Sequence, residues 1–119
     1  MVDLPRVPDG LTEEIAARCD QVLVTVVTTV AGIAAAMRTC GRFADPGALG
    51  LVVRGSGMDD VSLSRAVGVP VLQRMSDQRG LAETIDVGLG PVRSRRGPLG
   101  RAASGVLAAL AEQASSRAA

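Results

Sequence analysis

Hydrophobic residues along the chain gather in short runs, and amphipathic segments separate these runs. The runs at residues 22–27, 49–54 and 69–74 consist mostly of Val and Leu without regular polar alternation, a pattern typical of strands buried on both faces of a sheet. A shorter stub, Val-Asp-Leu-Pro, stands at residues 2–5. Its Pro5 cannot donate to a sheet ladder, so we interpret the stub as the end of a further strand.

The segments between the runs carry the start and stop signals of helices. Asp and Thr oxygens can accept a hydrogen bond from the free backbone N–H groups of a helix start, and Gly favours the backbone turn at a helix end. The expected starts are Asp9 or Thr12, Asp59 or Asp60, and Asp77, and the expected stop is Gly68. These signals predict helices at about residues 9–18, 31–43, 59–67, 77–87 and 98–113.

Apolar strands that alternate with helices predict the α/β class, with a three-layer parallel sheet of about four strands and helices on both faces. A chain of 119 residues is long enough for one domain, which we expect at residues 1–113, followed by a flexible tail at 114–119. Ligands of such sheets bind beyond the carboxyl ends of the strands. The candidate site residues therefore lie at Asp3, Thr28 and Thr29, 54–57, and 74–77.

The composition excludes several kinds of catalytic site. The chain contains no His, Trp or Tyr, and all 13 basic residues are Arg, so His-dependent bases, Lys Schiff bases and a phosphate-loop Lys are absent. Phe43 is the single aromatic residue, which excludes a stacking platform for single-stranded nucleic acid. With a net charge of +1, we expect no sequence-specific nucleic-acid partner, and the chain alone is a poor candidate for an enzyme.

Neither the cysteines nor the start of the chain points to an oxidising compartment. Cys19 and Cys40 lack a metal-ligand spacing and are interpreted as small buried side chains. Residues 1–20 lack a basic, then apolar, leader pattern, so a cytoplasmic location is expected. The uncharged stretch at 21–37 is shorter than the ~20 residues of a membrane span and changes from β-branched to Ala-rich, which predicts strand, loop and helix.

Two known classes were compared with this pattern. A phosphorylation receiver domain needs a Lys after its fifth strand, and this chain has none. The order of five stretches instead resembles the carboxyl-terminal half of the MinD/ParA group of P-loop ATPases, and its CpaE-like or septum-site-determining branch in high-GC bacteria. These stretches are VDLPR, CDQVLVTVVTTVAGIAAAMR, LGLVVRG, VGVPVLQRMSDQRGLAETIDVGLGP and RRGPLGRAASGVLAAL.

The resemblance implies a partial P-loop fold that lacks the Walker A half, with ATP and Mg²⁺ bound in the intact protein and none expected for this chain alone. In that family a strand ending in hydrophobic–Asp–x–Pro carries the Walker B or switch acid, which acts on Mg²⁺ indirectly. Asp3 matches this acid and Pro5 the proline. The alternative is that Asp3 is a frayed terminal residue.

The resemblance also implies nucleotide contacts at Thr28, Arg54, Gly55, Ser76 and Asp77. Arg54 stands where the family has an Asn, and because Arg has donors and no acceptor, it would stack on a base or bind a phosphate rather than copy the amide. Ser76 replaces the family's Pro in the loop beside the base. The simpler alternatives are helix capping near Thr28 and at Asp77, and a solvated strand end at Arg54.

The function implied by the resemblance is septum-site determination or regulation of cell division, through nucleotide-dependent dimerisation in the intact protein. A CpaE/TadZ-like localisation factor for a pilus or secretion apparatus is the alternative, as is a non-catalytic interaction scaffold. The expected partners are a second copy of the chain and proteins of the division, pilus or secretion machinery, with recruitment to the septum or pole. The basic residues Arg93, Arg95 and Arg96 are interpreted as a solvated connector, or else as a contact for phosphates, acidic lipid or nucleic acid.

Overall fold

A parallel three-stranded sheet forms the centre of the computed structural model, which describes residues 1–7, 9–92 and 94–119. The strands are β1 (Val22–Val27), β2 (Leu49–Arg54) and β3 (Val71–Met75), in the order β1-β2-β3. Val22 pairs with Leu49 and Val27 with Arg54, and the register between β2 and β3 shifts after Leu51. The predicted α/β class and parallel sheet are confirmed, with three strands in the described residues where about four were expected.

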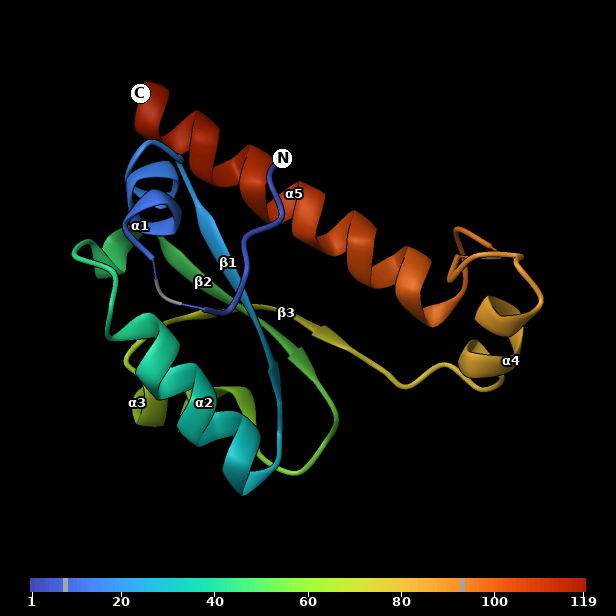
Figure 1. The fold of residues 1–119 in the computed structure, drawn as a ribbon. Helices are drawn as coiled ribbons and strands as arrows, with labels where there is room; N and C mark the ends of the chain where they lie inside the picture. Colours follow the sequence, from blue (N-terminus) through green and yellow to red (C-terminus); the bar gives the residue numbers. More distant parts are fainter. Residues whose placement is uncertain (8, 93) are drawn as a thin grey trace.

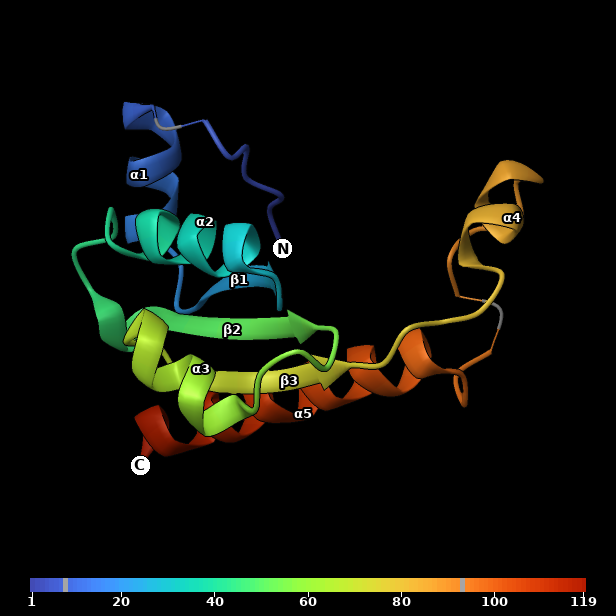
Figure 2. The same cartoon turned by 90° about the horizontal axis from the view of Figure 1, so that it is seen from below.

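Helices cover both faces of this sheet and give three layers (Figure 1). Two helices pack together against one face, and the longest helix lies along β3 on the other. The remaining two lie outside these layers: one beside the outer edge of β1, near residues 1–7, and one beyond the carboxyl end of β3 (Figure 2). The two helices on one face are α2 (Val30–Cys40) and α3 (Asp60–Val67), and the long helix on the other face is α5 (Pro98–Ala118). The helix beside β1 is α1 (Gly10–Ala17), and the helix beyond β3 is α4 (Leu81–Asp86). A short 3₁₀ turn, Pro46–Ala48, precedes β2.

The main core lies between the sheet and the α2–α3 layer. Alternate strand residues point to the same face, so Leu49, Leu51 and Val53 of β2 all enter this core, where each is at most 1% exposed. Leu63 of α3 is also fully buried there. On the opposite face, Gly50 makes room for Leu72 of β3, since a Cβ at Gly50 would lie 2.3 Å from the Leu72 side chain.

Two predicted helix starts, one predicted stop and the alternative of a helix cap near Thr28 are confirmed. Asp9 caps α1 by accepting from the Thr12 amide at 2.6 Å, and Asp59 caps α3 by accepting from the Ser62 amide at 2.9 Å. Thr29 caps α2 through the Gly32 amide at 3.0 Å. Gly68 ends α3 in the left-handed conformation. These bonds satisfy donors that a helix start would otherwise leave free.

Other local predictions are wrong. Residues 1–7 form no strand, because β1 pairs only with β2 and no described strand offers the stub a partner. Asp77 does not cap α4, which begins four residues later behind Gly80, because the Asp77 carboxylate pairs with Arg54 instead. The last helix continues past its predicted end at 113 to Ala118, while the flexibility of the tail and the domain limits stay predictions. No helix in the described part of the chain is long and apolar enough to cross a membrane.

Candidate functional site at the carboxyl ends of the strands

Polar side chains from all three strand ends meet at one edge of the sheet. β1 runs into Thr28, β2 ends at Arg54 and continues into Gly55, and β3 runs into Asp77. The parallel register places these ends together, as the sequence predicts. Direct contacts join them: Thr28 bonds to the connection after β2, and Arg54 bonds to Asp77. Four of the five predicted nucleotide-binding positions thus lie in one cluster, and their predicted role is a proposal.

Thr28 holds the glycine-rich connection after β2 close to the end of β1. Its backbone N–H donates to the Arg54 carbonyl at 3.1 Å, and its Oγ1 accepts from the Gly57 amide at 3.0 Å. Gly55 has a φ of +98°, and a Cβ there would lie 2.7 Å from Thr28 Oγ1. At Gly57 a Cβ would lie 2.6 Å from the Thr28 carbonyl oxygen. Glycine is therefore required at both positions for this close approach.

Arg54 and Asp77 form an ion pair across the strand ends. The Arg54 Nε donates to Asp77 Oδ1 at 3.1 Å, with 54% of the Arg54 side chain and 72% of the Asp77 side chain exposed. Within the described part of the chain, the two terminal nitrogens of this guanidinium make no hydrogen bond. An exposed pair of this kind contributes little to stability. Both charged groups therefore stay accessible to a ligand.

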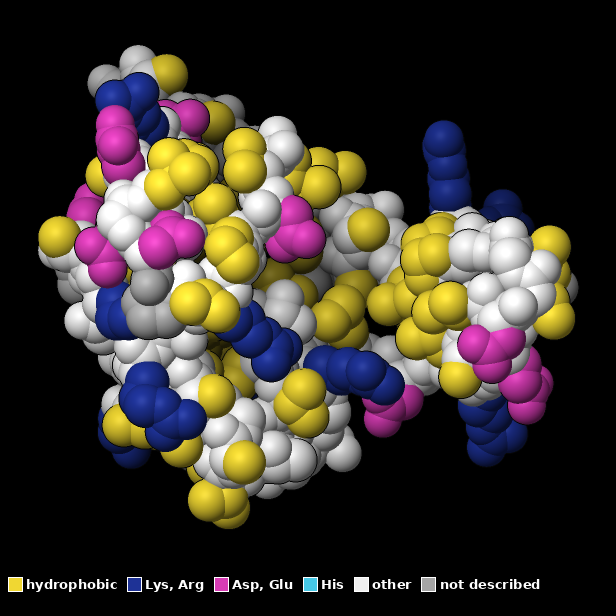
Figure 3. All heavy atoms as spheres, in the orientation of Figure 1, with side chains coloured by type: hydrophobic (Ala, Val, Ile, Leu, Met, Phe, Trp, Pro, Cys, Tyr) yellow, Lys and Arg dark blue, Asp and Glu magenta, His cyan; other side chains and the backbone are white. Residues whose placement is uncertain are grey.

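A recess of about 480 Å³ opens beside this ion pair. Its walls are Arg54, Gln78 and the first turns of α4, where Leu81, Ala82 and Ile85 supply aliphatic surface. Gln78 Nε2 donates to the Pro91 carbonyl at 3.1 Å and so ties this wall to the connection after α4. In the space-filling view, basic and acidic side chains lie in the gap between the sheet-bearing body and the lobe that contains α4 (Figure 3). The recess combines donors, acceptors and an apolar wall.

Arg74 is a residue of this edge whose role the sequence reasoning missed. Its Nε and Nη2 donate to Asp60 Oδ1 at 2.9 and 2.6 Å, Nη2 also donates to the Met58 carbonyl at 2.7 Å, and Nη1 donates to the Gly55 carbonyl. Only 27% of its side chain is exposed. Arg74 thus fastens the connection after β2 to the start of α3. The available signal was a charged residue inside a strand whose other residues, apart from Gln73, are apolar.

The remaining predicted site residues lie apart from these contacts. Ser76 is exposed on the connection between β3 and α4. Asp3 is exposed in the non-regular segment 1–7, so it does not stand at a strand end, and its role as a Walker B or switch acid stays a prediction. Arg93 lies outside the described residues, while Arg95 and Arg96 are exposed on the connection to α5.

The residues of this edge fit one part of a nucleotide and not the other. A base could lie in the recess between the aliphatic wall of α4 and the Arg54–Asp77 pair. For the phosphates and Mg²⁺, the chain has no Lys of a phosphate loop, and its described residues contain no group of three Cys, Asp or Glu side chains that could hold a metal ion.

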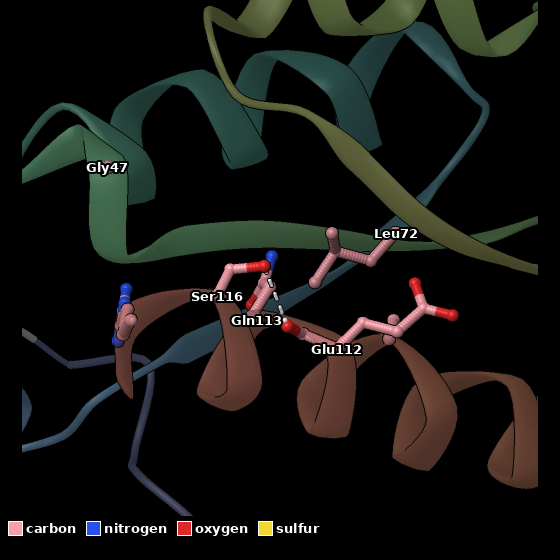
Figure 4. A pocket seen from close by; sticks show the side chains of 7 residues that line it. Gly47, Leu72, Glu112, Gln113 and Ser116 are labelled. Carbon is pink, nitrogen blue, oxygen red and sulfur yellow. Dashed lines mark hydrogen bonds between the residues drawn. The ribbon is translucent and has the colours of Figure 1, made fainter. Parts of the chain in front are cut away.

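A second recess, of about 440 Å³, lies between α5 and the start of β3. Leu72 points from the sheet toward α5, whose Glu112, Gln113 and Ser116 line the other side (Figure 4). Ser116 Oγ donates to the Glu112 carbonyl at 3.0 Å and so stays within the helix. Since Leu72 stands near the amino end of β3, this recess lies away from the strand ends and brings no charged cluster to the candidate site.

The fold is similar to that of a solved structure, the crystal structure of a ParA family ATPase from Chlorobium tepidum TLS, with a TM-score of 0.64. The match covers 86% of this chain and 46% of that chain at 13% sequence identity, so this chain spans about half the length of the ATPase. No protein-family model and no curated protein matches the chain. At this identity the likeness shows the fold alone, so the predicted ParA-like fold is confirmed, and the CpaE-like or septum-site branch stays a prediction.

Proposed function

We propose that this chain is the base-binding half of a ParA-like protein that positions the cell-division machinery in a nucleotide-dependent way. The observation that carries the proposal is the convergence of Thr28, Arg54 and Asp77 at the carboxyl edge of a ParA-like parallel sheet. In open α/β sheets this edge is where ligands bind. The chain supplies contacts to the base, and the phosphate-binding residues come from another segment or chain.

Within this proposal each residue has a distinct task. Thr28 fixes the distance between the first two strand ends, since it bonds to Gly57 on the far side of the β2 connection. Arg54 faces the base, Asp77 holds the Arg54 guanidinium, and the aliphatic residues of α4 cover the base. ATP with Mg²⁺ would supply the phosphoryl chemistry in the intact protein, where Asp3 would act as the acid of the metal site. The resemblance implies no nucleotide on this chain alone, whereas the base-binding edge leads us to propose that the chain alone binds a nucleotide without hydrolysing it.

A localisation factor for a pilus or secretion apparatus is the second candidate. The observation that favours it is Arg54 itself, because the CpaE/TadZ-like branch accepts Arg where the other members of the group carry Asn. In both cases the protein would dimerise and work in the cytoplasm, with recruitment either to the septum or to a pole. A scaffold that keeps the fold and binds no nucleotide is the third candidate.

Localisation of the full gene product separates these candidates. A fluorescent fusion expressed from the native locus should form a mid-cell band before constriction, and Thr28→Val or Arg54→Ala should disperse this band. Arg38→Ala, which changes an exposed Arg on α2 far from the strand ends, is the matched control and should leave the band intact. Polar foci that persist through division would favour the pilus or secretion alternative.

If Thr28→Val and Arg54→Ala both leave the localisation of the fusion unchanged, the result would contradict a nucleotide-dependent role and favour the scaffold. The upstream coding sequence gives an independent check. A glycine-rich loop with its Lys favours the ATPase assignment, because such a loop cradles the phosphates of a nucleotide. A loop without these residues favours the scaffold.

A further inference from the structure

The orientation of the Arg54 guanidinium restricts what it can recognise. Asp77 accepts from Nε at 3.1 Å and so holds the inner edge of the planar group. The two terminal nitrogens remain, and in the described part of the chain they have no hydrogen-bond partner. They form an end-on fork of donors, which matches a pair of neighbouring acceptors on a planar ligand. Asp77 is thus a positioning residue for this fork.

The surroundings of the fork suit a planar ring. The recess beside it holds about 480 Å³, within the range of small-ligand sites. The recess has an aliphatic wall, formed by Leu81, Ala82 and Ile85, and no aromatic residue lines it. Packing against this wall would therefore give different purine bases nearly the same affinity. Discrimination between bases therefore depends on the polar contacts of Arg54.

The two common purines differ at the edge that such a fork would contact. Guanine presents two neighbouring acceptors, O6 and N7, and Arg binds them with two parallel bonds. Adenine has an amino donor beside N7, which faces the Arg donors and cannot accept from them. We propose that Arg54 binds the O6 and N7 acceptors of a 6-oxopurine, so this site prefers a guanine or hypoxanthine nucleotide to an adenine nucleotide. The inference rests on the proposed nucleotide site, and it departs from the resemblance by replacing the adenine of ATP with a 6-oxopurine.

Binding of three nucleoside monophosphates to the chain as it exists tests this inference. GMP, IMP and AMP carry the same ribose phosphate, so differences in affinity report the base alone. Saturation-transfer-difference NMR observes the ligand and tolerates self-association of the protein. We expect GMP and IMP to bind alike, each about tenfold or more tighter than AMP, as for a bidentate Arg contact. IMP lacks the guanine 2-amino group, so its equality with GMP assigns the readout to O6 and N7.

Variants separate the fork from bulk charge. Arg54→Lys keeps the charge and removes the planar fork, so the preference for GMP over AMP should fall to about twofold or less. Asp77→Ala leaves Arg54 free to rotate, and the same preference should weaken while AMP binding changes little. Arg79→Ala removes an equal charge from a neighbouring exposed residue and is the matched control, with the preference unchanged.

The outcomes distinguish this inference from the proposed function. AMP binding as tight as GMP, or IMP binding as weak as AMP, overturns the base preference and leaves nucleotide binding in place. A GMP preference that survives Arg54→Lys overturns the role of Arg54. Binding of none of the three nucleotides at millimolar concentration overturns both the inference and the nucleotide site on which it rests.

Discussion

Two arginines at the same edge of the sheet differ in what their charges are used for. The Arg74 side chain is 27% exposed and donates to Asp60 and to the carbonyls of Met58 and Gly55, so its guanidinium is occupied by the protein. The Arg54 side chain is 54% exposed and bonds to Asp77 through Nε. The first arrangement stabilises the connection after β2, and the second leaves donors for a ligand.

This difference predicts effects of different size on stability when each arginine is truncated. Arg74→Ala would leave the Asp60 carboxylate and two backbone carbonyls without their partner, so we expect a loss of about 1–3 kcal/mol in the free energy of unfolding. Arg54→Ala breaks an exposed ion pair and should change it by less than about 1 kcal/mol. Urea unfolding followed by circular dichroism measures both. Equal losses would mean that Arg74 is not the structural residue of the pair.

The helix caps predict how stability depends on pH. The hydrogen bond from the Ser62 amide lowers the pKa of Asp59, and hydrogen bonding to Thr12 lowers the pKa of Asp9. A carboxyl whose pKa is lowered by folding stabilises the protein above its unfolded pKa, and this contribution is lost as the pH falls through the folded pKa. Stability should therefore fall as the pH drops below about 4.

Thermal melts of the chain and of Asp59→Ala between pH 7 and pH 3 check this expectation. The variant should melt at a lower temperature at pH 7, and its gap from the parent chain should narrow as the pH falls toward 3, because protonation of Asp59 weakens the cap. Asp20→Ala is the control, since Asp20 is an exposed acid that caps no helix. A gap between variant and parent that is constant across this range would contradict a role for the ionised carboxylate.

At the scale of elements, the strands and helix ends that depend on nearby residues could be predicted from the sequence. Features that depend on pairing between distant residues could not. The runs around Leu51 and Val24 predicted parallel strands because both faces of the sheet are used, and Asp59 and Gly68 predicted both ends of α3 because caps act within three or four residues. Asp77 was assigned to a helix start by the same local rule. Its partner Arg54 lies 23 residues away, and no local pattern shows that pairing.

The candidate site was predictable to the same extent. Parallel strands place their carboxyl ends at one edge, so the cluster of Thr28, Arg54 and Asp77 follows from strand order. The contacts within it do not follow, because they depend on side-chain directions set by the turns after each strand. Asp3 was wrongly placed at a strand end, since a stub forms a strand only beside a partner strand.

The contact between α5 and β3 depends on Gly105. A Cβ at this position would lie 1.9 Å from Gln73 Oε1, so Gly105→Ala forces the Gln73 side chain to turn and to give up its bond to the Arg74 carbonyl, which is 2.8 Å long. Ala also favours a helix over Gly by about 1 kcal/mol. We expect the two effects to cancel partly, so that Gly105→Ala alone is neutral or destabilising.

A double-mutant cycle resolves the two effects. In a Gln73→Ser background the added methyl group has room, and Gly105→Ala should then stabilise the chain by about 1 kcal/mol in urea unfolding. The interaction energy between the two sites should be clearly different from zero. Additive effects would mean that α5 adjusts its distance from β3 without involving Gln73.

At the scale of the whole molecule, the chain holds the strand ends of a ParA-like sheet without the Lys of a phosphate loop. It spans 46% of the ParA family ATPase that it resembles in fold, and it contains no Lys. Phosphoryl transfer depends on positioned charges around the phosphates and the metal. We therefore expect no ATP hydrolysis by the chain, measured as phosphate release against a blank without protein. Turnover that disappears in Asp3→Ala would contradict this expectation.

The outer edge of β1 is the feature that governs association of the whole molecule. β1 pairs with β2 on one side, and residues 1–7 and α1 lie along its other side without pairing as strands (Figures 1 and 2). Val27, at the end of this strand, is 45% exposed. An unpaired apolar edge offers backbone donors and acceptors to a second chain. We expect the chain to self-associate through this edge, or to be poorly soluble.

The direction of the backbone groups supplies a selective test. The Thr28 amide donates to Arg54 on β2, so by the alternation of a strand the amide of Val26 also points to β2 and that of Thr25 points outward. Thr25→Pro therefore removes an outward donor without touching a bond to β2, and Pro is accepted on edge strands at such positions. Thr25→Val keeps the donor and is the matched control. Multi-angle light scattering at high concentration should show masses above the monomer for the chain and for Thr25→Val, and a monomer for Thr25→Pro. A monomeric parent chain would contradict association itself, and association that persists in Thr25→Pro would exclude the β1 edge as its route.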